Sequence, residues 1–188
     1  MKTEKEKMLA GVYYNPSDPE LSNDREKAKI ILRRFNTTPV EEADKKIEII
    51  NKFFGSVGQN CWIEPPFQCD YGYNINLDEH VYFNVNCVVL DGNKVNIGKN
   101  VMFGPAVQIY TVTHPLDPNE RLTGKEITSG INIGDNAWIG GSSVILPGII
   151  IGENSIIGAG SIVTKPIPDN VIARGNPCRV IKKIEKKK

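Results

Sequence analysis

The sequence of 188 residues has no excess of charge of either sign and no long apolar run. Lysine and arginine number 23 against 22 aspartates and glutamates, which leaves a formal net charge of +1. Because basic and acidic residues are nearly equal in number, the charge gives no general reason to expect nucleic acid or a membrane surface as a partner. No window approaches the roughly 18 apolar residues of a membrane-spanning helix, and the first residues lack an apolar signal core. These absences predict a soluble cytoplasmic protein.

Cysteine and histidine are also scarce. The four cysteines form no CxxC pair, and only His80 and His114 could add imidazole ligands. A structural zinc site needs four closely spaced cysteine or histidine ligands. We therefore expect no bound metal, and we expect the cysteines to be free thiols in a reducing compartment.

What the sequence has instead is a repeat of six residues, clearest between Ile131 and Lys165. The aliphatic residues on its main phase are Ile133, Ile139, Ile145, Ile151, Ile157 and Val163. A period of six fits neither an α-helix nor a two-faced strand. It fits a three-sided solenoid whose short strands each bury one side chain, with glycine or asparagine at the corners. The expected corner asparagines are Asn93, Asn100, Asn136 and Asn154.

Residues 1–56 lack this repeat and show helical periodicity. Thr3 and Glu6 have the spacing of a capping box, and Ser22 can cap a second helix. Thr38, followed by Pro39, predicts the start of a third helix. Helices this short do not fold alone, so we expect them to pack on the first coils or on a neighbouring subunit.

The main phase breaks once, after Val112, and resumes in frame at Ile131. Residues 113–130 are therefore predicted to form a loop that projects from the regular solenoid. Long loops on rigid scaffolds are usually functional. An earlier part of the chain also has a six-residue repeat, but its apolar residues are offset from the main phase. The two phases meet after a two-residue shift of the repeat near residues 91–94.

His114 opens this loop, and Pro115 holds its backbone extended. A neutral imidazole is a suitable general base near pH 7 for an alcohol, which cannot ionise by itself. The alternative, an ordinary exposed loop histidine, stays open. For His80, near a coil corner, we expect a solvated surface role.

Several blocks of the chain resemble the maltose and galactoside O-acetyltransferases, a family of hexapeptide-repeat acyltransferases. They are Glu64-Pro65-Pro66-Phe67, the string from Tyr110 to Pro118, Trp138-Ile139-Gly140-Gly141 and the stretch from Gly175 to Ile181. The N-terminal residues resemble the helical cap of the maltose enzymes. The resemblance covers essentially the whole chain. It implies a mainly β fold, a left-handed parallel β-helix over residues 57–181, with a helical cap at 1–56 and a basic tail at 182–188.

The resemblance also implies acetyl transfer from acetyl-CoA to a sugar hydroxyl, without an acetyl-enzyme. His114 matches the family's catalytic base. Asn84 matches an asparagine that holds the acceptor hydroxyl, since an amide can both donate and accept. The backbone N–H of Gly141 matches the donor to the tetrahedral oxyanion.

For the acceptor, the resemblance points to Asp18 and Asp70, with Asp91 as an additional candidate. The galactoside enzymes carry serine where this chain has Asp70 and an acid where it has Gly92. These departures favour a maltose- or glucose-like acceptor over galactosides, although each aspartate could instead be a turn-former.

For coenzyme A, family positions along the cofactor groove are matched by Trp138, Gly141, Ala159, Thr164, Lys165, Arg179 and Lys182. Cations such as Arg179 favour phosphate groups. The family forms trimers whose sites lie between subunits, so we expect a homotrimer in which His114 faces the neighbour's groove.

Other functions remain to be weighed. An acetyltransferase with a non-sugar acceptor, such as an antibiotic or an amino acid hydroxyl, stays open. A β-helix carbonic anhydrase needs three metal-binding histidines, and this chain has two. An ice-binding β-helix needs a regular threonine array, whereas the outward residues here are mixed. The sequence does not identify the physiological sugar.

Overall fold

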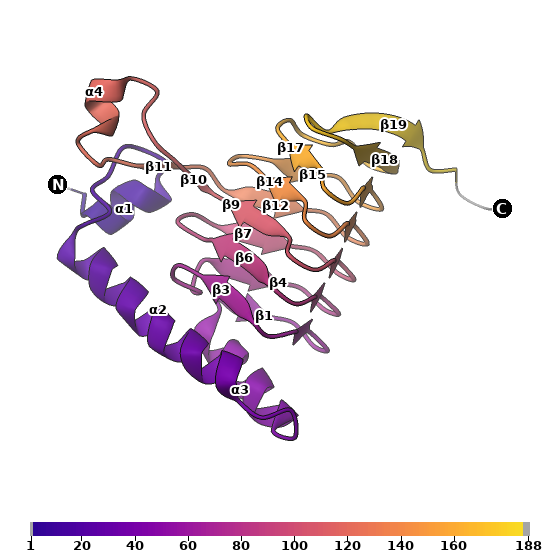
Figure 1. Ribbon diagram of the computed structural model, residues 1–188, viewed down its shortest axis with the longest axis horizontal. Coiled ribbons are helices and arrows are strands. Elements are labelled where there is room, and N and C mark those ends of the chain that lie inside the picture. The colour runs from indigo at the N-terminus through magenta and orange to yellow at the C-terminus, as the bar shows by residue number, and fades with distance from the viewer. Residues whose placement is uncertain (1, 186–188) are drawn as a thin grey trace.

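The computed structural model describes residues 2–185 and has the predicted architecture, a three-sided β-solenoid of about six turns with a helical cap (Figure 1). Face 1 holds β1 Ser56–Val57, β4 Ile75–Leu77, β7 Val95–Ile97, β12 Ile131–Ile133 and β15 Ile150–Ile151. Face 2 holds β2 Trp62–Ile63, β5 Tyr82–Phe83, β8 Met102–Phe103, β13 Trp138–Ile139, β16 Ile156–Ile157, β18 Val171–Arg174 and β19 Arg179–Lys183. Face 3 holds β3 Phe67–Cys69, β6 Cys87–Leu90, β9 Gln108–Tyr110, β14 Val144–Ile145 and β17 Ile162–Val163.

The length of each coil follows from the strand register. Trp62 pairs with Tyr82 and Tyr82 with Met102, a step of 20 residues, whereas Trp138 pairs with Ile156, a step of 18. Eighteen residues are three hexapeptides, so the early coils carry two extra residues each rather than one slip near residue 91. Between Met102 and Trp138 the step is 36 residues. The excursion, the segment of residues 113–130 that leaves the regular coils, therefore adds one coil's length of chain. This is why the repeat resumes in frame.

The inward residues of successive coils form one continuous core. On face 2 the rings of Phe83 and Phe103 stack with centroids 4.1 Å apart, and Ile139 and Ile157 continue the column. All four side chains are essentially inaccessible to solvent. A single coil could not exclude water from such a row, so the stacking of coils provides the hydrophobic stabilisation.

The corner between faces 1 and 2 is built from left-handed backbone conformations. The residues with positive φ there are Asn60, His80, Asn100, Asn136, Asn154 and Asn170. The Asn100 amide donates to the Oδ1 of Asn136, and Asn136 donates to Asn154, each at 2.9 Å. The predicted corners at Asn100, Asn136 and Asn154 are thus confirmed. Asn93 also lies at a corner, between β6 and β7, but it is buried, its φ is not positive, and its amide donates to Thr128 Oγ1.

The cap consists of α1 Glu4–Leu9, α2 Pro19–Thr37 and α3 Ala43–Phe53. The capping box of Thr3 and Glu6 is present as predicted. Ser22 does not cap α2, because Asp18 accepts from the N–H of Glu20 and Pro19 opens the helix. Thr38 does not start α3 either. It ends α2, where its hydroxyl donates to the Arg34 carbonyl, and α3 begins only at Ala43.

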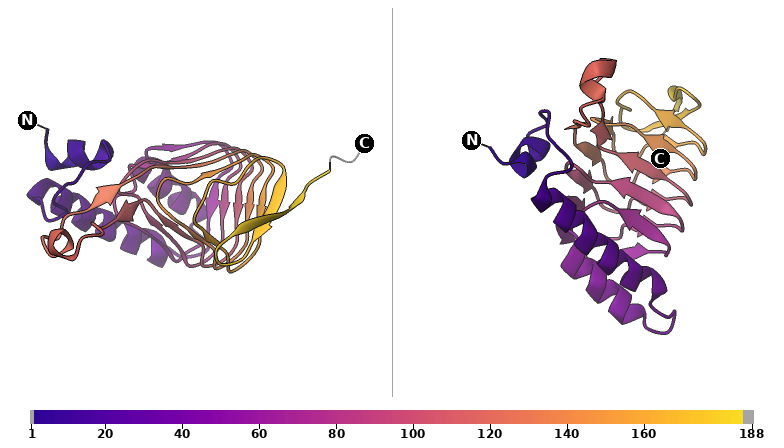
Figure 2. Two further views of the ribbon diagram at one scale, coloured as in Figure 1. Left: turned by 90° about the horizontal axis from the view of Figure 1, so that it is seen from above. Right: turned by 60° about the vertical axis from the view of Figure 1, so that its left-hand side comes forward.

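Helices α2 and α3 cover the open end of the first coil (Figure 2). Leu32, Phe35 and Ile50 join the solenoid core at Phe67. The side-chain amide of Asn36 donates to the carbonyl of Phe67 and accepts from its N–H, both at 2.9 Å. The cap therefore packs on the first coils, one of the two alternatives that the sequence left open.

The other end of the solenoid is closed by the chain folding back. Strand β18 continues face 2 in parallel with β16, and β19 then returns antiparallel to β18. Lys186–Lys188 of the predicted basic tail lie outside the described residues. Within residues 2–185, the helices are too short or too polar to cross a bilayer.

Candidate active site

The corner between faces 3 and 1 carries the excursion and the predicted acceptor residues. Asp70 and Asp91 lie at this corner in the first two coils, and the chain leaves the third coil here after Tyr110. The excursion forms β10 Val112–Thr113, α4 Pro118–Arg121 and β11 Ile127–Thr128, with β10 and β11 antiparallel. Its strand β11 lies beside α1 (Figures 1 and 2).

A cleft of about 540 Å³ opens at this corner. Its lining residues are Tyr14, Pro16, Ser17, Arg25, Asp70, Tyr71, Leu90, Tyr110, Val112, His114 and Glu126. They come from the cap, from three successive coils and from the excursion. The cleft therefore exists only when all three parts are folded together.

His114 lies in this cleft with both ring nitrogens near the returning arm of the excursion. Its Nδ1 is 3.2 Å from the carbonyl oxygen of Lys125, and its Nε2 is 4.0 Å from Oε1 of Glu126. The side chain is 51% exposed. A carbonyl can only accept, so this contact assigns the imidazole proton to Nδ1 and leaves the Nε2 lone pair directed toward the cleft.

Glu126 is held by the cap residue Tyr14. The two residues form an antiparallel bridge in which each N–H donates to the other's carbonyl, both at 3.1 Å. The Tyr14 hydroxyl also donates to Oε2 of Glu126. Burial and the neighbouring carboxylate raise the pKa of Tyr14 well above its usual range, so its hydroxyl remains a donor.

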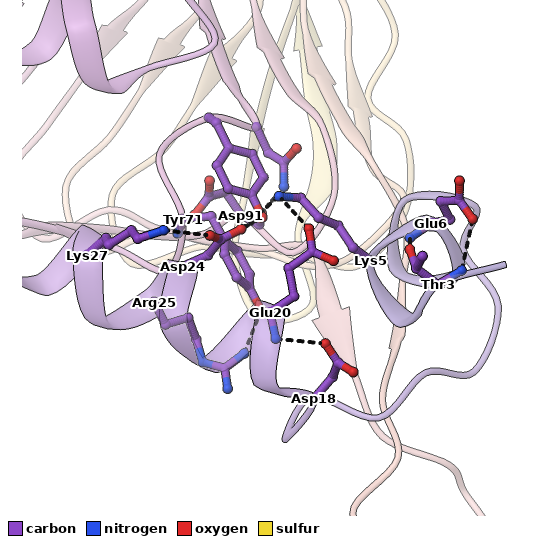
Figure 3. A network of polar contacts seen from close by, with 12 residues as sticks. Thr3, Lys5, Glu6, Asp18, Glu20, Asp24, Arg25, Lys27, Tyr71 and Asp91 are labelled. Atoms are coloured by element: carbon purple, nitrogen blue, oxygen red, sulfur yellow. Dashed lines mark hydrogen bonds and ion pairs between the residues drawn. The ribbon is translucent and has the colours of Figure 1, made fainter.

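Asp70 forms one wall of the cleft beside Arg25 and Tyr71. Arg25 of α2 donates to the Tyr71 hydroxyl (Figure 3) and to the carbonyl of Pro16, both at 2.6 Å. Burial raises the pKa of Asp70, the charge of Arg25 opposes this rise, and the charge of Glu126 adds to it. Two carboxylates and one guanidinium thus face the same space.

The other two predicted acceptor residues have structural contacts. Asp18 caps α2 (Figure 3) and is not among the residues that line the cleft. Asp91 is fully buried, and its Oδ1 accepts from the backbone N–H groups of Asp70 at 3.0 Å and Tyr71 at 2.8 Å. Burial raises the pKa of Asp91 to about 6. Neither its Oδ2 nor Oδ1 of Asn74 has a partner among residues 2–185.

The remaining predicted site residues lie at a different corner, between faces 2 and 3. Asn84 follows β5, Gly141 follows β13 and Ala159 follows β16. The chain from Asn84 to Asp91 crosses face 3, a span of up to about 23 Å at ~3.3 Å per residue. Within one chain, Asn84 is therefore at the opposite edge of a solenoid face from the corner that bears His114.

The predicted coenzyme A residues continue from this second corner toward the C-terminal end. Trp138 projects outward from face 2, Thr164 and Lys165 follow β17, and Arg179 and Lys182 lie on β19. All five are exposed. Small residues at the corner let the coils stack closely, since a Cβ on Gly140 would lie 2.5 Å from the N atom of Ala159.

The outward side of face 2 carries an apolar column. The residues paired along it are Trp62, Tyr82, Met102, Trp138, Ile156 and Ile172. Met102 is 50% and Trp138 49% exposed. Monomers seldom leave so continuous an apolar surface uncovered, so this column is a candidate for contact with another molecule.

Tyr14, Arg25 and Glu126 line the cleft but were not predicted as site residues from the sequence. Arg25 reads as one charge among many on an amphipathic helix. Tyr14 and Glu126 are 112 positions apart in the chain, yet their side chains meet. The one sequence feature that pointed to Glu126 is its position in the segment that interrupts the repeat, where functional residues are expected.

Comparison with known proteins adds the family context. Residues 7–58 match the family model of the maltose acetyltransferase hexapeptide capping motif, and residues 130–165 match that of the bacterial transferase hexapeptide with six repeats. A putative acetyltransferase of Dictyostelium discoideum is 50% identical over 182 residues, which cover 97% of this chain and 95% of that protein.

Two solved structures are similar over nearly the whole chain. The crystal structure of a maltose O-acetyltransferase from Clostridium difficile 630 has a TM-score of 0.94 at 50% identity, covering 98% of this chain and 99% of that one. A galactoside acetyltransferase in complex with coenzyme A has a TM-score of 0.95 at 40% identity, covering 98% and 92%.

Proposed function

The chain belongs to the maltose and galactoside O-acetyltransferase family, and we propose that it acetylates a maltose- or glucose-like sugar with His114 as general base. Its solenoid is the left-handed parallel β-helix of these enzymes, and its activity is acetyl-CoA-dependent O-acetylation of a sugar. The observation that carries the proposal is the placement of His114, whose Nδ1 faces the Lys125 carbonyl while Nε2 faces the cleft.

The proposed reaction uses this placement of His114. Nε2 of His114 takes the proton of the acceptor hydroxyl as that oxygen attacks the thioester carbonyl of acetyl-CoA. Asn84 holds the acceptor hydroxyl, and the N–H of Gly141 donates to the oxyanion of the tetrahedral intermediate. When this intermediate collapses, the C–S bond breaks and the imidazolium returns its proton to the departing thiolate. Atoms and charge balance without a covalent enzyme intermediate.

The acceptor lies against Asp70, which accepts hydrogen bonds from sugar hydroxyls. The Arg25 and Tyr71 side chains shape the same wall. Asp91 contributes indirectly, because it fixes the backbone of Asp70 and Tyr71 from below. Asp18 likewise acts by fixing the start of α2, close to the Ser17 edge of the cleft.

Coenzyme A lies along the corner between faces 2 and 3. The small residues Gly141 and Ala159 leave room for the pantetheine arm, and Trp138 flanks the thioester. Thr164, Lys165, Arg179 and Lys182 extend the groove to the C-terminal end, where exposed cations meet the phosphates. The observed set of small corner residues followed by exposed basic residues fits this ligand.

A homotrimer completes the site. His114 and Asn84 lie at opposite edges of face 3, so a second copy must bring its excursion to the corner of the first. The uncovered apolar column of face 2 supports such an association, and closed cyclic assemblies are the usual form of head-to-tail contacts.

The deciding experiment measures thiol release from acetyl-CoA against maltose, glucose, galactosides, serine and chloramphenicol. Sugar-dependent release that disappears in His114→Ala supports the proposal, and the rates rank the acceptors. Release only with serine or chloramphenicol would favour the non-sugar alternative. Full sugar-dependent release by His114→Ala would remove the base role.

A further inference from the structure

The arm of the excursion that faces His114 is fixed by the cap as well as by the solenoid. On one side Thr113 pairs with Ile127 in the β10–β11 ribbon. On the other side Glu126 bridges to Tyr14 through two backbone hydrogen bonds of 3.1 Å. Below these contacts the buried Thr128 hydroxyl donates to the carbonyl of Met8 at the end of α1. The segment 125–128 is therefore clamped between two neighbours.

The clamp extends to the carboxylate. Tyr14 is only 2% exposed, and its hydroxyl donates to Oε2 of Glu126. With that oxygen occupied, Oε1 is the one that lies 4.0 Å from Nε2 of His114. Glu126 is 21% exposed on its side chain, so bulk water screens the approach only partly. A glutamate held at one oxygen has lost most of the rotamer freedom that would otherwise oppose this placement.

We propose that Tyr14 is a positioning residue for catalysis, because its hydroxyl holds the Glu126 carboxylate against the imidazolium that His114 becomes on taking the acceptor proton. This rests on the proposed role of His114 as the base. A neutral imidazole gains little from the carboxylate. The cation formed during the reaction gains more, since opposite charges about 4 Å apart attract each other. The interaction therefore acts on the transition state more than on the bound substrates.

A purely structural role for the pair makes a different prediction. If Tyr14 and Glu126 only tie the cap to the excursion, removing the hydroxyl would lower the thermal stability and leave the turnover of the folded enzyme unchanged. The positioning role instead predicts a change in kcat with unchanged KM for acetyl-CoA. It also predicts that the two side chains act as one unit.

The test compares Tyr14→Phe, Glu126→Gln and the double variant with the wild-type enzyme. Tyr13→Phe is a matched control, because Tyr13 is the neighbouring tyrosine, is 46% exposed and does not line the cleft. We expect each single variant to lower kcat about tenfold, a fraction of a general-base contribution. The double variant should be no slower than Glu126→Gln, because the hydroxyl has no charge left to position. Tyr13→Phe should match the wild type.

The outcomes separate this inference from the proposed function. Normal kcat in Tyr14→Phe, a loss that appears only in KM, or losses that multiply in the double variant would each overturn the positioning role. If Tyr14→Phe does not fold, the near-isosteric Glu126→Gln still decides, since normal turnover there overturns the role of the carboxylate. Sugar-dependent, His114-dependent release by the wild-type enzyme in the same assay shows that the proposed function itself stands.

Discussion

The carbonyl oxygen of Lys125 lies 3.2 Å from Nδ1 of His114, so one peptide group of the excursion orients the ring and favours the tautomer with the proton on Nδ1. The donor and the acceptor are 11 residues apart, and the β10–β11 ribbon brings them together. A backbone carbonyl remains in place under any side-chain substitution at residue 125. Substitution of His114 therefore tests the base itself, whereas substitution of Lys125 should leave the ring oriented.

We expect His114→Ala to lower kcat by about 100-fold or more, a typical loss for a general base. The affinity for acetyl-CoA should stay nearly unchanged, because the cofactor groove follows a different corner. Steady-state kinetics and a coenzyme A binding titration measure the two quantities separately. Turnover within a few-fold of the wild type would exclude His114 from the mechanism.

We expect Asp70→Ser to change the ranking of acceptor sugars more than the KM for acetyl-CoA. The substitution removes a carboxylate from the cleft wall and installs the residue that the galactoside enzymes carry. The ratio of kcat/KM for maltose to that for a galactoside is the measurement. An unchanged ratio would make Asp70 a structural residue of the corner.

A shared site predicts complementation between two inactive chains. In a trimer that mixes His114→Ala with Asn84→Ala subunits, one of the three sites receives both an intact histidine and an intact asparagine. Random mixing of equal amounts should then restore about a quarter of the wild-type activity in co-expressed enzyme. Activity no greater than that of the parents, or a monomer in sedimentation, would place the whole site within one chain.

Asp91 should make stability depend on pH. Its pKa is raised to about 6 by burial, against about 4 in an unfolded chain. The folded state then binds the proton more tightly, so the free energy of unfolding falls as pH rises from about 4 to about 6 and stays lower above that.

Asp91→Asn should remove that dependence and raise the stability at pH 8 by on the order of 2 kcal/mol. An asparagine oxygen can still accept from the backbone of residues 70 and 71. Denaturant unfolding at pH 4, 6 and 8 gives the profile, with the exposed Glu26→Gln as the control. Lower stability at pH 8 would contradict this account.

His80 interrupts the column of corner asparagines with positive φ, at 61°. Asparagine adopts this conformation more readily than histidine, and its amide could extend the side-chain ladder that begins at Asn100. We expect His80→Asn to stabilise the protein by about 0.5–1 kcal/mol and to leave activity unchanged. A decrease in the unfolding midpoint would show that the ladder cannot extend to this coil.

The sequence predicted the solenoid well because its rule is local: one inward residue in six must be apolar, as at Ile139, and the corner must tolerate positive φ, as at Asn136. Cap boundaries were less certain, since Thr38-Pro39 has the form of a helix start yet closes α2. His114 could be predicted as a site residue because it begins the segment that interrupts the main phase of the repeat. Tyr14, Arg25 and Glu126 could not, because their meeting depends on how the cap packs against the excursion. No periodicity encodes that contact.

The two hydrogen bonds between the side-chain amide of Asn36 and the backbone of Phe67 bear on how the solenoid avoids polymerisation. A stack of parallel coils ends in strands whose backbone groups can template further strands, which is the geometry by which cross-β fibres grow. Here the side-chain amide of Asn36 occupies both backbone groups of Phe67, with α2 and α3 packed alongside. The helical cap thus serves as a chain terminator for the solenoid, and the length of the stack is limited to the coils that one polypeptide supplies.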